Sequence, residues 1–116
     1  MTAFEETLDQ LCQLLAQHES IRAYQAIEMK VQQLPDLQDQ IHRMKAYQQD
    51  AVLFEKIEKS QAYQAADEKA ARIQEDIENQ PIVEDYRAKL QDASDLLTYI
   101  TKRLEEGINE ELNHGK

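Results

Sequence analysis

The longest hydrophobic pattern runs from Asn79 to Leu112 and predicts one long C-terminal helix. Its apolar residues recur at alternating steps of three and four, the 3.5-residue period of a helix that lies along another helix. Pro81 suits the first helical position because its missing N–H would be unpaired there anyway, and Asn79 or Gln80 can act as the N-cap. The positions of this heptad seam are Val83, Tyr86, Leu90, Ala93, Leu97, Ile100 and Leu104.

Shorter helical stripes predict the remaining elements. Phe4, Leu8 and Leu15 mark a helix over residues 3–17, with Thr2 as N-cap, and Ser20 can cap a second helix. Leu34-Pro35 opens a third helix, because proline pushes the preceding residue out of the helical region. Ser60 can cap the fourth. We therefore expect a single helical domain over residues 1–116, with N-terminal helices in 2–34, a third in 35–59, a fourth in 60–79 and the long helix in 80–112.

Composition supports an all-α fold of about five helices, arranged as an antiparallel bundle around the long helix. Two glycines and two prolines are too few for the turns of a sandwich or an α/β fold. Leu, Ile, Val and Phe make only 26 of the 116 residues, which favours a thin bundle over a thick core. A thin bundle leaves an apolar stripe short of partners, so we expect a homodimer or a hetero-complex.

Charge and cysteine content exclude several function classes. The net charge is −10 and no basic tract occurs, which disfavours direct binding to nucleic acid or to an anionic membrane. The acidity either keeps the bundle soluble or provides a face for a basic partner. Cys12 is the only cysteine, which fits a cytoplasmic protein, and neither a signal peptide nor a transmembrane segment is visible.

Candidate chemistry is sparse along the chain. Asp39 with His42, and Glu111 with His114, have the i, i+3 spacing found in di-iron bundles, but such pairs arise by chance among so many acids. No phosphate-binding loop, nucleophile elbow or C-x-x-C motif is present. We therefore expect no catalytic residue, no cofactor and no metal site, and Cys12 is interpreted as a small buried hydrophobe.

The aromatic residues are mostly tyrosines, which suit half-buried positions and protein interfaces. Packing at the rim of the bundle is the more ordinary explanation for such tyrosines. Tyr47, Tyr63 and Tyr99 lie off or beside the hydrophobic stripes. They are therefore the candidate interface residues.

Several segments together resemble the YlbF/YmcA family of small bacterial helical proteins, most of all its YmcA branch. The segments are Gln49-Asp50-Ala51-Val52, Glu58-Lys59 with Ala62, Pro81-Ile82-Val83-Glu84-Asp85-Tyr86-Arg87 and Asp95-Leu96-Leu97. The strongest piece is the helix start with Pro81, Val83, Tyr86 and Arg87, followed by Asp95. The resemblance covers most of residues 37–112.

This resemblance implies a five-helix fold with one long, largely buried helix, and it implies self-association or association with other family members. It also implies a regulator of ribonuclease Y-dependent RNA processing, with effects on competence, biofilm formation and sporulation. Some members of the YmcA branch carry a cysteine-bearing tail linked to iron–sulfur binding. This chain has only Cys12, and a cluster needs several thiolates, so the chain alone should hold none.

The interpretation is a non-enzymatic cytoplasmic adaptor that acts through protein–protein contacts. One alternative is a small all-α enzyme whose site is assembled from dispersed carboxylates. The other is a purely structural helical protein whose acidic faces only solvate it. A titratable group buried in a deep pocket would favour the enzyme, whereas an apolar patch with tyrosines at its rim would favour the adaptor.

Overall fold

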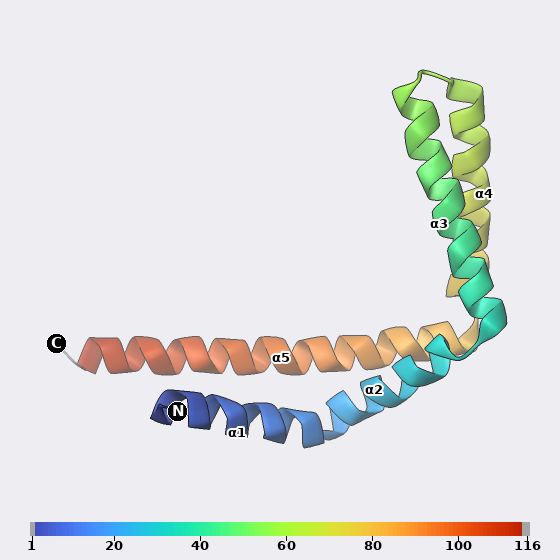
Figure 1. Cartoon of the computed structure of the whole chain (residues 1–116). Helices are drawn as coiled ribbons and strands as arrows, with labels where there is room; N and C mark the ends of the chain where they lie inside the picture. Colours follow the sequence, from blue (N-terminus) through green and yellow to red (C-terminus); the bar gives the residue numbers. More distant parts are fainter. Residues whose placement is uncertain (1, 115–116) are drawn as a thin grey trace. The chain divides into compact units, whose positions relative to one another are not determined.

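A computed structural model describes residues 2–114, and nearly all of them are helical (Figure 1). No strand occurs in this part of the chain. The all-α prediction is therefore confirmed, as is the single long helix at the C-terminal end. The five helices are α1 (Ala3–Gln17), α2 (Glu19–Gln32), α3 (Pro35–Lys56), α4 (Ser60–Glu78) and α5 (Pro81–His114).

Contacts within the chain divide it into two units. Unit 1 contains α1, the first part of α2 up to Ile27, and α5 from Arg87 onward. Unit 2 is the continuous segment Glu28–Tyr86, which holds the rest of α2, the whole of α3 and α4, and the start of α5. Each unit has its own packing, and the two are described in turn.

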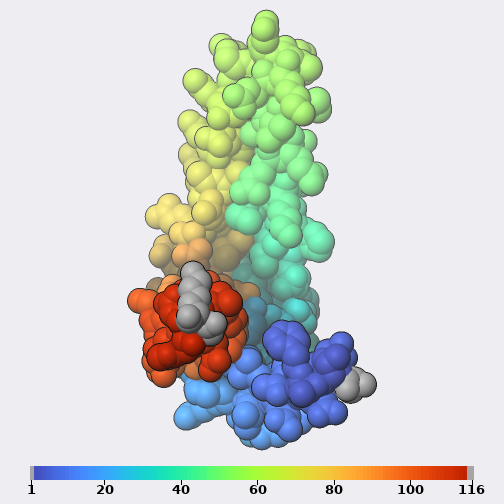
Figure 2. Space-filling model, turned by 90° about the vertical axis from the view of Figure 1, so that its left-hand side faces the viewer, coloured from blue at the N-terminus to red at the C-terminus, as the bar shows by residue number. Residues whose placement is uncertain are grey.

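Unit 2 is built on the antiparallel hairpin of α3 and α4, which lie side by side along their length (Figures 1 and 2). Small side chains fill much of the contact: Ala51 on α3 and Ala66 and Ala70 on α4 are all buried. Alanine side chains let two helix axes approach closely, so dispersion contacts form between backbones as well as side chains. Two helices with few large apolar residues can therefore still pack together.

Larger apolar side chains gather where the hairpin meets the start of α5. Leu37, Ile77 and Val83 form the buried cluster, and Leu37 is the most buried residue of the three. Beside this cluster, Gln80 Nε2 donates a hydrogen bond to Gln40 Oε1 at 2.6 Å, and Gln38 Nε2 donates to the Val31 carbonyl at 2.9 Å. The partly buried residues packed on the cluster are Val31, Ile41, Met44, Ile73 and Ile82.

Two of the predicted helix starts are confirmed. Thr2 Oγ1 accepts a hydrogen bond from the Glu5 amide at 3.1 Å and so caps α1. Leu34 is extended, with φ −92° and ψ 104°, and Pro35 occupies the first turn of α3. For α5 the structure decides between the two candidates: the Gln80 carbonyl accepts the first helical bond from Glu84, whereas Asn79 ends α4.

Two predicted caps are wrong. Ser20 does not cap α2; instead, His18 Nδ1 accepts a hydrogen bond from the Ser20 amide at 3.1 Å, and the His18 carbonyl accepts from Arg22. An imidazole that is not protonated at Nδ1 can accept the orphan amide just as a serine hydroxyl does. Ser60 does not cap α4, because the N-cap position is Lys59, whose side chain makes no capping bond.

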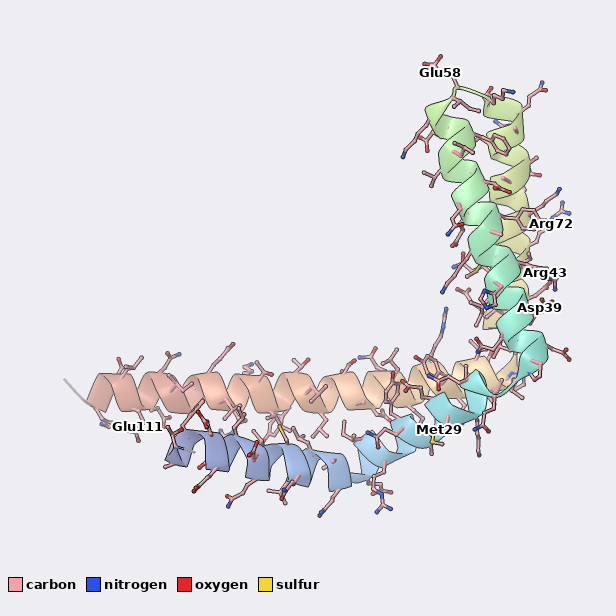
Figure 3. All side chains as sticks on the ribbon, viewed as in Figure 1. Met29, Asp39, Arg43, Glu58, Arg72 and Glu111 are labelled. Carbon is pink, nitrogen blue, oxygen red and sulfur yellow. The ribbon has the colours of Figure 1, made fainter. Side chains whose placement is uncertain are left out.

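The turn between α3 and α4 forces one residue into a left-handed backbone conformation. Glu58 has φ 59° and stands at the tip of the hairpin (Figure 3). The Lys59 amide donates to the Phe54 carbonyl at 2.9 Å, and the Glu58 amide donates to the Glu55 carbonyl at 3.2 Å. These two bonds make a Schellman motif, in which glycine usually occupies the position of Glu58.

Unit 1 pairs α1 with α5, which run antiparallel beside each other (Figure 1). None of the residues of α1 is buried. On α5 the only buried residue of this unit is Ala93, and residues 101–114 are exposed throughout. The fully buried residues of unit 1 are therefore few, Ile27 of α2 and Ala93 of α5, while Leu11 and Leu15 of α1 are half-buried.

Within residues 2–114, every helix is too short or too polar to cross a membrane.

The left-handed turn gives a stability prediction. Glu58→Gly should raise the free energy of unfolding by about 1 kcal/mol, because a side chain in this backbone region costs roughly 1–2 kcal/mol and glycine avoids that cost. Urea unfolding followed by circular dichroism measures the change. Glu55→Gly, three residues earlier inside α3, is the matched control and should lower the stability by about 1 kcal/mol. A loss of stability in both variants would contradict the strain assigned to Glu58.

Candidate protein-interaction site

Large apolar side chains lie exposed on α1 and on the part of α5 that belongs to unit 1. Phe4 at the start of α1 is 75% exposed, and Leu104 on α5 is 49% exposed. Soluble monomers usually carry contiguous apolar patches of a few hundred Å² at most. We call six of these exposed residues the apolar face of unit 1: Phe4, Leu8, Leu97, Leu104, Ile108 and Leu112.

The heptad seam predicted for the long helix shows mixed burial. Val83 and Ala93 are buried, and Tyr86 and Ile100 are half-buried. The exposed seam residues are Leu90, Leu97 and Leu104. Leu97 lies at the centre of the predicted seam and is 46% exposed, so the single chain does not supply the packing that the heptad pattern calls for.

The family-motif residues at the start of α5 divide between the two units. Pro81, Val83 and Tyr86 belong to unit 2, where Pro81 is exposed and Val83 joins the buried cluster. Arg87 and Asp95 belong to unit 1 and are exposed. Asp95 Oδ1 accepts a hydrogen bond from Gln91 Nε2 at 2.8 Å, one turn earlier on the same helix. Within each unit these residues belong to a helix start or to a helix surface.

Leu96 is a packing residue that the heptad pattern missed. It is half-buried, whereas its neighbour Leu97 is exposed. Leu96 lies three residues after Ala93 and four before Ile100, so all three share one side of α5. A straight helix of 3.6 residues per turn drifts away from a 3.5-residue repeat. Testing both periods against the sequence would have found Leu96.

A shallow hollow of about 400 Å³ lies near the end of α5. A Cβ atom built on Gly107 would meet nothing within 4 Å, so no packing inside the chain requires glycine there. Glycine inside a helix costs roughly 0.5–1 kcal/mol relative to alanine. The hollow is lined by one helix alone, by Arg103, Leu104, Gly107, Ile108, Glu111 and Leu112.

The three candidate interface tyrosines lie in different surroundings. Tyr47 on α3 is half-buried, and Lys69 Nζ of α4 lies 5.4 Å from the centre of its ring, a cation–π contact. Tyr63 on α4 is half-buried beside a hollow of about 210 Å³ that Phe54 and Glu58 also line. Tyr99 belongs to unit 1 and is 62% exposed. Tyr99 therefore offers the most surface to a partner.

Ionisable groups are spread over the surface of the described chain. Within residues 2–114 no charged side chain is buried, and no group of three His, Cys, Asp or Glu side chains could hold a metal ion. Asp39 pairs with Arg43 at 3.4 Å, and His42 is exposed. Figure 3 labels Asp39 and Arg43 on α3. Cys12 is an exposed thiol, so the expectation that it is buried is wrong.

Comparisons with known proteins identify a family and a relative that this chain resembles. Residues 4–109 match the family model described as "Control of competence regulator ComK, YlbF/YmcA". One similar protein is the "Uncharacterized protein YmcA" of Bacillus subtilis (strain 168). It is 21% identical over 102 residues, which cover 88% of this chain and 71% of that protein.

Burial inside the single chain predicts different costs for two leucines. Leu37→Ala should lower the free energy of unfolding by about 2–5 kcal/mol, because Leu37 is 3% exposed and its removal leaves a cavity. Leu97→Ala removes a side chain that is 46% exposed and should cost about 1 kcal/mol or less in the single chain. Urea unfolding at low protein concentration compares the two. Equal losses there would mean that Leu97 is packed within one chain.

Proposed function

The chain belongs to the YlbF/YmcA family of regulators, and from this premise we propose that it is a non-enzymatic adaptor that acts by binding other proteins. The supporting observation is the apolar face of unit 1. Because no residue of α1 is buried, the apolar side chains of unit 1 are not fully covered within the single chain. A second protein surface that covers Leu97, Leu104 and their neighbours would complete their burial.

A homodimer is the simplest way to cover this face. Two-fold dimers are the commonest closed assemblies, and they bring the same patch of each subunit together. Burial of apolar surface stabilises such a contact by about 25 cal/mol per Å². Lost translational and rotational freedom offsets part of that gain, so the exposed area sets no affinity. A related family member with a similar face could replace one subunit, giving a hetero-complex in the cell.

The family description supports a proposal for the regulated process. The family description names control of the competence regulator ComK, and we propose a role in that control through ribonuclease Y-dependent RNA processing. Effects on biofilm formation and sporulation would be downstream of the same complex. The adaptor would work in the cytoplasm, where a single exposed thiol stays reduced.

The two alternatives to an adaptor are an enzyme and a purely structural protein. An enzyme would need titratable groups that converge on a substrate, whereas no charged side chain within residues 2–114 is buried and most of the acids there are exposed. A purely structural protein would not need to leave large apolar side chains open to water. The exposed leucines of unit 1 are therefore the observation that favours an adaptor over both alternatives.

Light scattering after size exclusion at micromolar concentration tests the dimer. The protein should elute with about twice the chain mass of 13.5 kDa. Leu97→Asp combined with Leu104→Asp places two charges on the apolar face and should give a helical monomer. The matched control, Val52→Asp with Leu53→Asp, changes two equally exposed apolar residues of unit 2 and should leave the mass unchanged.

A wild-type mass near that of one chain would overturn the homodimer. If the control variant became monomeric while the unit 1 variant stayed dimeric, the interface would lie on α3 instead. Purification of the wild type and both variants from cells then asks whether a related family member occupies the same face.

A further inference from the structure

We propose that α3 carries a second interaction surface, separate from the apolar face of unit 1, which binds an acidic amphipathic helix of a partner protein. The surface consists of residues at i, i+4, i+7, i+8 and i+11, which share one side of a helix. We call it the basic–apolar face of α3; its members are Lys45, Gln49, Val52, Leu53 and Lys56.

This face is open to solvent along its length. The side of α3 that packs on α4 is marked by Leu37, Met44 and Ala51, and at 100° per residue the basic–apolar face lies on other sides of the helix. Val52 is 52% exposed and Leu53 is 54% exposed. A shallow hollow of about 310 Å³ lies against Val52 and is also lined by Lys45, Gln48 and Gln49. The face therefore has exposed apolar atoms and a recess that could take a side chain.

All the charged side chains of this face are lysines, although the whole chain has a net charge of −10. Neither Lys45 nor Lys56 has an ion-pair partner within residues 2–114. Their stems can lie along the apolar atoms while the ammonium groups stay in water. At 1.5 Å per residue, their Cα atoms are roughly 16 Å apart along the helix axis.

The acidic residues of α3 are turned to other sides. Asp39 pairs with Arg43 one turn later. Asp50 lines a hollow that it shares with Tyr47 and with Lys69 of α4, so it faces the groove between the two helices. Glu55 lines the hollow at the hairpin tip with Phe54, and Asp36 lies in the first turn. The positive potential of the two free lysines is therefore not cancelled on their own face.

The chemistry of this face selects the kind of partner. The backbone of α3 uses its amides and carbonyls within the helix, so it has no edge to which a strand could be added. A partner helix carries its own backbone hydrogen bonds and can lay an apolar stripe over Val52 and Leu53. Carboxylates on both flanks of that stripe would meet Lys45 and Lys56. Two lysines on an acidic protein are too few to hold nucleic acid or an anionic membrane.

Two synthetic helical peptides test the proposal by fluorescence anisotropy with the full-length protein. Both carry the same leucine stripe; one has glutamates on its flanks and the other has lysines. The glutamate peptide should bind, even though the net charge of −10 repels it, and the lysine peptide should bind at least tenfold more weakly. Equal binding of the two peptides, or no saturable binding of the glutamate peptide, would overturn the proposal.

Charge reversal then assigns the binding to α3. Lys45→Glu combined with Lys56→Glu should lower the affinity for the glutamate peptide by about tenfold. Leu53→Ala should lower this affinity by a smaller factor. The control, Arg72→Glu with Lys102→Glu, changes the net charge by the same amount at exposed sites elsewhere and should alter the affinity by less than about twofold. Arg72 lies on α4 and not on α3 (Figure 3). A tenfold loss in the control as well would show a general charge effect and overturn the assignment.

Light scattering on the same lysine variant excludes a second copy as the occupant. If the variant lost the wild-type dimer and the glutamate peptide failed to bind, α3 would be a self-association face and the proposal would be wrong. The proposal does not depend on the dimer through unit 1, because the anisotropy assay measures binding of the peptide to α3 whether or not that dimer forms.

Discussion

A shortage of large apolar side chains is the constraint on which the rest of the structure depends. Each helix can bury only a narrow stripe, so unit 2 packs alanines such as Ala66 and Ala70 against α3 and concentrates its larger residues around Leu37. Close approach of the helices compensates for small side chains by adding backbone dispersion contacts. Most of the buried large apolar side chains lie in the α3–α4 hairpin and in the cluster around Leu37. Unit 1 is left with half-buried leucines and an exposed face.

The same constraint connects structure with regulation. A protein that buries all its large apolar side chains within one chain gains little free energy from covering them with a partner. In the proposed adaptor, burial of the exposed apolar surface of Leu97, Leu104 and Ile108 against a partner would supply the free energy of association. Regulation by association also requires the complex to be reversible, and a contact completed by a few half-exposed leucines on thin helices suits that requirement better than a large dry interface.

The sequence predicted the fold class and most helix starts because these depend on local signals. Scarce Gly and Pro, the 3.5-residue repeat and the two prolines at helix starts are all visible without tertiary contacts. The wrong cap at Ser20 and the exposure of Cys12 depend instead on which groups meet in space. The left-handed Glu58 was invisible for a related reason: the expected signal for such a turn is glycine, and the chain tolerates glutamate there. The basic–apolar face of α3 could be seen only once the side that packs on α4 was known.

Electrostatics separates the two proposed surfaces. Two copies of a chain with a net charge of −10 repel each other, so the contact through unit 1 must gain its stability from apolar burial, and salt would strengthen it by screening the repulsion. On α3 the attraction depends on Lys45 and Lys56, and salt would weaken it. The net charge of −10 repels an acidic partner helix. This repulsion disfavours every contact except the one with the lysines of α3. In this proposal the overall acidity would discriminate against wrong contacts, and Lys45 and Lys56 would mark the position at which an acidic helix binds.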